Sequence, residues 1–282
     1  MTTISWIDAA GIWGHANKHR LDHLLQDPIE ASPAFIHALT GNSLNQFVFW
    51  ERGSPMTVRG WAFVHGTRGA CTWSILRGDE FCFETYLQAA LPREKTIYEY
   101  IREEERGFYS RITGAKPAPF AWYYEITRES FRGHVRDPMA LLLPEPFKMP
   151  LFHPARARDW FAFQGYPAEE PAFSIYPRLD GIIATSEGSI AASMHDGLSL
   201  LPFRVPEVVI NGVKVAENDR GKGLCTALLR VFLDRLFSAG KRRAGLFVSV
   251  DNEAAMRCYE RAGFLKKQLY YKLVLDEAKS SS

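Results

Sequence analysis

The sequence lacks the features that assign many chains to a class at once. None of its four cysteines, Cys71, Cys82, Cys225 and Cys258, stands in a C-x-x-C pair, so neither a dithiol motif nor a zinc ribbon is indicated. No apolar run approaches the ~18 residues of a membrane span, and charged residues interrupt the N-terminal stretch where a signal sequence would be apolar. We therefore expect a cytoplasmic protein with reduced thiols and no membrane partner.

An excess of charge of one sign is also missing. The 282 residues include 34 Lys and Arg against 32 Asp and Glu, for a net charge of +2, so no nucleic-acid partner is expected. Three histidines, His15, His19 and His23, have the spacing of one helix face, and metal binding there is conceivable. Because no further Cys or His completes a ligand set, we favour a solvated helix face and predict no metal.

The stretch from residue 217 to 236, ENDRGKGLCTALLRVFLDRL, carries the strongest local signal. The β-branched run EVVINGVKV at residues 207–215 predicts a strand before it. After the turn Arg220-Gly221-Lys222-Gly223, one apolar face recurs with helical periodicity, and Gly240 stands where a left-handed helix end is expected. The residues of that face are Leu224, Leu228, Leu229, Phe232, Leu233 and Leu236.

Glycines between a strand and a helix N-terminus suit an anion. The first turn of a helix has unpaired N–H groups and a partial positive charge, and glycine lets consecutive amides point inward around a phosphate. Arg220 and Lys222 add positive charge. The turn is neither a Walker loop nor a G-x-G-x-x-G fingerprint, so by itself it could also be a charged surface turn.

A second pattern follows in register. AGLFVSV at residues 244–250 predicts a buried strand, and DNEAAMRCYERAGF at residues 251–264 predicts a short helix closed by Gly263. In order and spacing, residues 180 to 277 resemble the GNAT-type N-acetyltransferases, with Arg220-x-x-Gly223-x-Cys225 in place of that family's Q/R-x-x-G-x-G/A. Cys225 departs from the usual Gly or Ala but is also small.

The resemblance implies acetyl-CoA as co-substrate and assigns roles to matching residues. The strand before the turn would pair with the pantetheine through Val213 and Val215, and Asn252 would contact the cofactor. Tyr259 would be the general acid for the departing thiolate, although it could instead be a core aromatic. The amides that would hold the pyrophosphate are those of Arg220, Gly221, Lys222, Gly223, Leu224 and Cys225.

The general base is less clear. Glu207 begins the predicted strand and is the nearest carboxylate on the same face as Val209 and Val215, but the position that best matches the family's base holds Val209. His195 and Asp196 in the predicted strand pair at residues 181–197 are rivals. A loop or edge charge is the plainer role for each of them. We predict Tyr259 and Glu207 as the catalytic pair.

The first half repeats the order of elements without the glycine turn. Strands and helices alternate through residues 46–127, and GFYSRITG and WYYEIT resemble RCYERAGF and YYKLVL of the second half. This suggests a degenerate copy of the same fold, an arrangement that also occurs in the family. Arg77-Gly78-Asp79-Glu80 stands where the turn would repeat, and two carboxylates there would repel a pyrophosphate.

We therefore predict an α/β (α+β) protein of two GNAT-like lobes, each a mixed, mostly antiparallel sheet flanked by helices. The predicted domains are a degenerate lobe at residues 1–137 and an acetyl-CoA-binding domain at residues 138–282, joined within a Pro-rich segment at residues 128–178. The expected activity is acetyl transfer to the amine of a small molecule. A peptide or protein amine and a non-catalytic CoA-binding regulatory module are alternatives, and a homodimer is conceivable.

Overall fold

The computed structural model describes residues 2–39, 45–52, 57–67, 71–89, 95–149, 157–165, 180–201 and 204–275. The chain forms two compact units, each discontinuous in sequence. Unit 1 comprises residues 1–27, 33–122 and 268–282, and unit 2 comprises residues 28–32 and 123–267. The sequence predicts a single boundary after residue 137, which divides the chain differently from these two units. That boundary stays a prediction.

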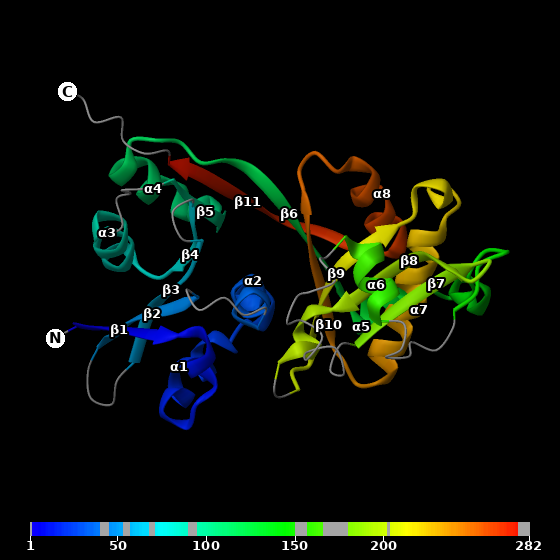
Figure 1. The fold of residues 1–282 in the computed structure, drawn as a ribbon, viewed down its shortest axis with the longest axis horizontal. Coiled ribbons are helices and arrows are strands. Elements are labelled where there is room, and N and C mark those ends of the chain that lie inside the picture. Colours follow the sequence, from blue (N-terminus) through cyan, green and yellow to red (C-terminus); the bar gives the residue numbers. More distant parts are fainter. Residues whose placement is uncertain are drawn as a thin grey trace. The chain divides into compact units, whose positions relative to one another are not determined.

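The sheet of unit 1 is mostly antiparallel (Figure 1). Its strands lie in the order β1-β2-β3-β4-β5-β11, and only the β4–β5 pair is parallel. β11 enters the sheet from the far end of the sequence, pairing Tyr271 with Ile101 and Leu275 with Thr96. The strands are β1 Thr2–Asp8, β2 Gln46–Arg52, β3 Thr57–Thr67, β4 Cys71–Arg77, β5 Thr96–Ile101 and β11 Leu265–Leu275.

Aromatic side chains fill the core between this sheet and two helices. Helices α3 and α4 pack on each other, and α3 also contacts β3 and β4. Phe83 of α3 meets Tyr109 of α4 edge-to-face, with ring centroids 5.4 Å apart, a favoured aromatic geometry. The helices that belong wholly or partly to unit 1 are α1 Lys18–Leu24, α2 Pro28–Leu39, α3 Glu80–Ala89 and α4 Arg106–Thr113, with 3₁₀ turns η1 Ala9–Trp13, η2 His15–Asn17 and η3 Glu103–Glu105.

The start of α3 shows why no anion loop is expected there. The Asp79 carboxylate accepts a hydrogen bond from the Cys82 amide at 3.1 Å and pairs with Arg59, while Glu80 pairs with Arg111. Burial acts to raise the pKa of Asp79, but the hydrogen bonds from Arg59 and Cys82 outweigh it and lower that pKa. The helix N-terminus is thus already matched to negative charge.

One of the three histidines noted in the sequence has a structural role. His19 of α1 lies 2.7 Å from the buried carboxylate of Glu51, which Arg20 also contacts. Burial acts to raise the pKa of Glu51, but hydrogen bonds from Arg20, His19 and Ser5 lower it to about 2. Within the described residues, no group of three or more His, Cys, Asp or Glu side chains could hold a metal ion.

The sheet of unit 2 is built around a parallel pair, β9 and β10. β9 also pairs antiparallel with β8, and β8 with β7, so the strand order is β6-β10-β9-β8-β7. Residues 123–127 of β6 belong to this unit. The strands are β6 Ala118–Thr127, β7 Asp180–Ser186, β8 Ser189–Asp196, β9 Glu207–Val215 and β10 Arg243–Ser249.

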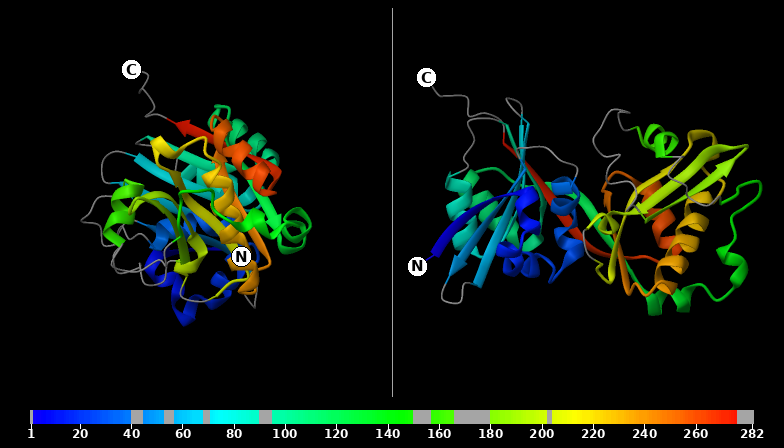
Figure 2. Two further views of the ribbon diagram at one scale, coloured as in Figure 1. Left: turned by 90° about the vertical axis from the view of Figure 1, so that its right-hand side faces the viewer. Right: turned by 60° about the horizontal axis from the view of Figure 1, so that its bottom comes forward.

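Helix α7 covers β7, β8 and β9 with the apolar face expected from the sequence (Figure 2). All six predicted positions are buried, and Phe237 joins them. Gly240 follows the helix with φ +96, a left-handed conformation that glycine adopts without steric cost. The helices of unit 2 are α5 Arg128–His134, α6 Ala157–Gln164, α7 Leu224–Ser238 and α8 Glu253–Ala262, with 3₁₀ turns η4 Pro138–Leu141, η8 Gly197–Leu200 and η9 Glu217–Asp219.

The predicted fold class is confirmed: both sheets are mixed, mostly antiparallel and flanked by helices. Residues 150–156 and 166–178 of the Pro-rich segment lie outside the described residues, and α6 lies between these two ranges. No helix among the described residues is long and apolar enough to cross a bilayer.

Candidate functional site: a cationic cavity at the start of helix α7

The predicted glycine turn lies between β9 and α7. Gly221 and Gly223 have φ of +79 and +75, a conformation that side-chain-bearing residues rarely adopt. Gly223 is the N-cap of α7, and it offers no side-chain cap to the first amides of the helix. A Cβ built on either glycine would meet no atom within 4 Å. The turn therefore leaves the first-turn N–H groups open to an incoming ligand.

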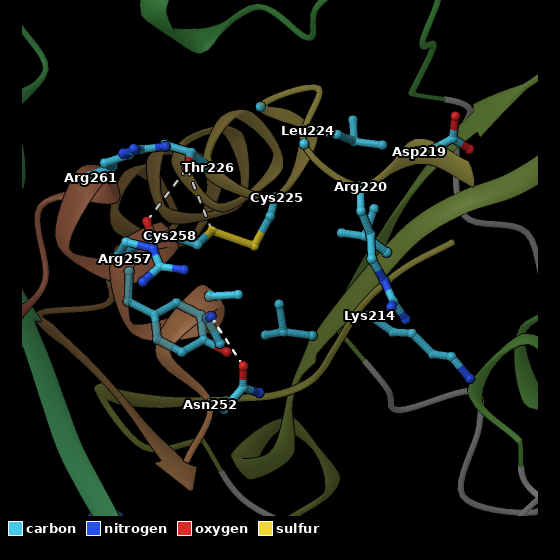
Figure 3. Close-up of a pocket in the computed structure, with 17 residues that line it drawn as sticks. Lys214, Asp219, Arg220, Leu224, Cys225, Thr226, Asn252, Arg257, Cys258 and Arg261 are labelled. Atoms are coloured by element: carbon cyan, nitrogen blue, oxygen red, sulfur yellow. Dashed lines mark hydrogen bonds between the residues drawn. A yellow bond between two sulfur atoms is a disulfide. The ribbon is translucent and has the colours of Figure 1, made fainter. Parts of the chain in front are cut away.

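These amides border a cavity of about 590 Å³ in unit 2 (Figure 3). This volume is within the range of small-molecule and cofactor sites. Three segments form the wall: the end of β9, the turn with the start of α7, and one face of α8. The lining residues are Val213, Lys214, Val215, Asp219, Arg220, Gly221, Gly223, Leu224, Cys225, Thr226, Asn252, Ala254, Ala255, Arg257, Cys258, Tyr259 and Arg261.

The wall carries an excess of positive charge. Lys214, Arg220, Arg257 and Arg261 line it, against one carboxylate, Asp219. Two of them make exposed ion pairs, Arg220 with Glu217 at 3.9 Å and Arg257 with Glu253 at 3.1 Å. Exposed pairs of this kind contribute ≈ 0–1 kcal/mol to stability. Together with the helix N-terminus, this charge suits an anionic ligand such as a pyrophosphate.

Of the predicted cofactor-binding residues, all but Lys222 line the cavity. The Lys222 ammonium instead lies 2.7 Å from the Asp219 carboxylate and 5.7 Å from the ring centroid of Phe147. Asn252 lines the cavity and also caps α8, because its Oδ1 accepts a hydrogen bond from the Ala255 amide at 3.2 Å. The cap uses only the Oδ1 atom, and the Nδ2 group takes no part in it.

Tyr259 lies in the cavity wall on α8 and is only 6% exposed. Its ring meets Tyr124 and Phe264 edge-to-face at 6.1 and 6.2 Å between centroids. Burial raises the pKa of its hydroxyl to about 12, so the hydroxyl keeps its proton at neutral pH. The ring therefore packs as a core aromatic, and the residue also borders the cavity; its role as general acid stays a prediction.

The expectation of reduced thiols is wrong for two of the cysteines. Cys225, the second residue of α7, forms a disulfide with Cys258 of α8, with 6.5 Å between their Cα atoms. The packing of α7 on α8 brings together two residues that are 33 positions apart in the sequence. A local C-x-x-C motif was therefore not needed.

Glu207, the predicted base, begins β9 and does not line the cavity. It stands opposite Arg243 in the parallel register with β10, and its carbonyl accepts a hydrogen bond from the Lys241 ammonium at 3.1 Å. The cavity residues of β9 begin at Val213. A catalytic role for Glu207 stays a prediction that this cavity does not support.

The two rival bases are buried in the sheet. The carboxylate of Asp196 accepts hydrogen bonds from the amides of Leu198 and Val209 at 2.9 and 3.1 Å, which gives it a structural role. His195 lies edge-to-face on Trp160 at 5.4 Å, and burial lowers its pKa to about 4. Neither residue lines the cavity.

Sequence reasoning missed one face of α8. Ala254, Arg257, Cys258 and Arg261 line the cavity, and their positions recur at intervals of three and four, as one helix face requires. This spacing was readable in the sequence. The family pattern assigns only Tyr259 of this helix a catalytic role, and it does not indicate the cationic side chains of Arg257 and Arg261.

A family comparison identifies this part of the chain. Residues 140–264 match the model of the Acetyltransferase (GNAT) family, and this span includes the whole cavity wall. These residues form a GNAT acetyltransferase domain. The match confirms the resemblance seen in the sequence for the second half of the chain.

Curated relatives of the GNAT domain match over short segments. Mycothiol acetyltransferase of Corynebacterium efficiens is 44% identical over 52 residues, which is 18% of this chain and 18% of the relative. N-alpha-acetyltransferase 30 of Schizosaccharomyces pombe is 37% identical over 62 residues, which is 22% of this chain and 41% of the relative. The chain thus spans less than half the length of either relative, and the matches do not fix a substrate.

Solved structures extend the likeness beyond the GNAT domain to the entire chain. A tandem GNAT protein from the clavulanic acid biosynthesis pathway superposes with a TM-score of 0.67 at 12% identity and covers 100% of both chains. A GCN5-related N-acetyltransferase from Sphaerobacter thermophilus gives 0.64 at 16% identity, covering 98% of this chain and 95% of its own. At such identities the likeness concerns the fold, and it supports the prediction of two GNAT-like lobes.

Proposed function

We propose that the protein is an acetyl-CoA-dependent N-acetyltransferase that acts on the amine of a small molecule. The observation that carries this proposal is the cavity itself. It brings the uncapped N-terminus of α7, four cationic side chains and the protonated hydroxyl-bearing residue Tyr259 to one concave wall. The helix N-terminus and the cationic side chains suit the anionic part of a nucleotide thioester, and Tyr259 suits its reactive thioester end.

The glycine turn fits the pyrophosphate of CoA. Gly221 and Gly223 hold the backbone in the left-handed conformation with open space at the Cβ positions, so an anion can approach the amides closely. Arg220 and the newly found Arg257 and Arg261 line the same cavity and would neutralise further phosphate charge. The backbone of Val213 and Val215 borders it along β9.

Acetyl-CoA supplies an activated acetyl thioester and leaves as a thiolate after attack by the amine. We propose that Tyr259 assists that departure, since a hydroxyl that keeps its proton at neutral pH can donate a hydrogen bond to a developing negative charge. Because the raised pKa of this hydroxyl lies above that of an ordinary thiol, about 8.5, we expect Tyr259 to stabilise the leaving thiolate by donating a hydrogen bond, and the thiolate takes its proton from water.

The acceptor amine must be neutral to attack. Because Glu207, His195 and Asp196 lie outside the cavity wall, we propose that the amine loses its proton to water and that Glu207 is not required. The relative named N-alpha-acetyltransferase 30 favours a peptide or protein amine as the second acceptor class to test. A non-catalytic CoA-binding module is the alternative from another class.

The deciding experiment has two parts. Calorimetry with CoA measures binding, and release of free thiol from acetyl-CoA in the presence of an amine panel measures transfer. The panel should hold small polyamines, amino sugars and short peptides with free N-termini. Binding with turnover on a small amine supports the proposal, turnover on peptides alone favours the second class, and binding without turnover on any amine favours the regulatory module.

A homodimer remains a prediction. Sedimentation velocity of the full chain at several concentrations tests it directly. The result does not bear on the chemistry, because every cavity residue named above belongs to unit 2 of one chain.

A further inference from the structure

The disulfide of this domain lies in the wall of the cofactor cavity. Cys225 and Cys258 both line it, and both are half-buried rather than enclosed. Figure 3 shows their sulfur–sulfur bond joining the first turn of α7 to α8, next to the side chain of Thr226. A small reagent in the cavity can therefore reach the bond without the protein unfolding.

Cys82 provides the contrast within the same chain. It is a free cysteine with no exposed surface, and burial, with the neighbouring Asp79 carboxylate, raises the pKa of its thiol to about 12. A thiol of this kind is inert near neutral pH, because the thiolate is the nucleophile. Cys82 is thus an internal reference for an unreactive position.

The surroundings of the disulfide favour sulfur anions. Cys225 lies in the first turn of α7, where the helix dipole stabilises negative charge, and Arg220 and Arg257 line the same cavity. The Thr226 hydroxyl lies 3.5 Å from Sγ of Cys258 and can donate to it. A negatively charged thiol is attracted to this wall, and Cys225 is a good leaving group there.

We propose that the Cys225–Cys258 disulfide is a thiol–disulfide exchange site that opens into the cofactor cavity and reacts with anionic low-molecular-weight thiols only while acetyl-CoA is absent. A thiolate RS⁻ attacks Sγ of Cys258, the sulfur–sulfur bond breaks, and Cys225 leaves as a thiolate that takes a proton from water. A second RS⁻ attacks the RS sulfur of the mixed disulfide. RSSR departs, and the Cys258 thiolate is protonated.

The net reaction converts two RSH and the protein disulfide into RSSR and two protein thiols, so atoms and electrons balance. Exclusion by CoA follows from shared space, because the sulfurs line the cavity that the cofactor would fill. This gating rests on the proposed function, whereas the exchange chemistry does not. The redox state of the pair would thereby report whether the enzyme is loaded with cofactor.

The test uses the full-length oxidised protein with reduced glutathione as the anionic thiol. Samples are quenched by alkylation, and mass spectrometry follows the peptides that contain Cys225, Cys258 and Cys82. We expect the pair to be reduced in buffer without denaturant while Cys82 stays unlabelled. Reduction that requires urea, or that is no faster than labelling of Cys82, would overturn the proposal.

Gating is measured with desulfo-CoA, which lacks the reactive thiol. At 100 times its dissociation constant, from calorimetry, only about 1% of cavities are free, so the reduction rate should fall about 100-fold. Unchanged reduction beside measured binding would refute the gating. If calorimetry detects no binding, the proposed function and the gating both fall, and the exchange is decided by the urea comparison.

Two variants test the chemistry. Cys225→Ser leaves Cys258 to attack oxidised glutathione and keep it as a mixed disulfide with release of one reduced glutathione; no adduct on the folded variant would contradict the cavity-facing site. Arg257→Gln removes one cavity charge. The attraction between that charge and a glutathione thiolate at a separation of ~7 Å in water is worth about threefold in rate, so the variant should be attacked about three times more slowly at low ionic strength. Lys267→Gln on β11, which removes the same charge outside the cavity wall, and the neutral thiol 2-mercaptoethanol are the controls; equal slowing by both variants would argue against attraction by the cavity.

Discussion

Replacing Gly223 by Asp tests the glycine turn most directly. The position is the N-cap of α7 with φ +75 and with open space where a Cβ would stand. A carboxylate there would lie beside the amides that are proposed to hold the pyrophosphate. At ~5 Å in water, repulsion between that charge and two phosphate charges is about 1.7 kcal/mol, which weakens binding about 17-fold.

A cavity less polar than water strengthens this repulsion, and dissolved salt weakens it. Gly223→Asn is the matched control, since it has nearly the same shape and also tolerates the left-handed conformation. Strain from the added side chain affects both variants equally, so the ratio of their CoA dissociation constants isolates the charge.

Calorimetry of CoA binding to wild type, Gly223→Asn and Gly223→Asp is the assay, with circular dichroism to confirm folding. We expect the Asp variant to bind at least ten times more weakly than the Asn variant at low ionic strength, with the gap narrowing as salt is added. Folded Asp and Asn variants that agree within twofold would refute the assignment of the pyrophosphate to this turn.

Three further predictions follow from the same site and its surroundings. Tyr259→Phe should lower kcat by about 10²–10⁴ with little change in CoA affinity; lost stability with normal turnover would mean that Tyr259 acts only as a core aromatic. Reducing the Cys225–Cys258 disulfide, which links residues 33 apart, should lower the free energy of unfolding by about 4 kcal/mol in the chain-entropy model, measured by urea denaturation with and without reductant. Burial lowers the pKa of His195 from 6.5 to about 4, so on acidification the imidazole takes up a proton in the unfolded chain before it does so in the folded one. The free energy of unfolding should therefore fall by up to about 3 kcal/mol between pH 6.5 and 4. If the free energy of unfolding of His195→Gln depends on pH as that of wild type does, this prediction is wrong.

The elements of the second half could be predicted because each carried a local signal. The apolar period of α7 and the glycines that follow α7 and α8 depend on neighbours within a few residues, and all were found where expected. The glycine turn was predictable for the same reason, since positive φ at Gly221 and Gly223 is a local requirement.

What depended on tertiary packing was not predictable. Arg257 and Arg261 become cavity residues only because α8 turns that face toward β9 and the turn. Alternation along a strand predicts that Glu207 shares a face with Val209 and Val215, which is why the sequence favours it as a base. The strand has nine residues, however, and this length separates its first residue from a cavity at its end. Strand alternation gives the face and not the distance.

The disulfide shows the same limit and adds a reason for it. The local pattern presents Cys225 only as a small residue in place of glycine or alanine. Packing of α7 on α8 then gives it a partner from 33 positions away, in the wall of the cavity that the turn itself forms. A residue that departs from a family pattern at a binding site is therefore best compared with the residues that could face it across the fold, here Cys258, before the departure is treated as neutral.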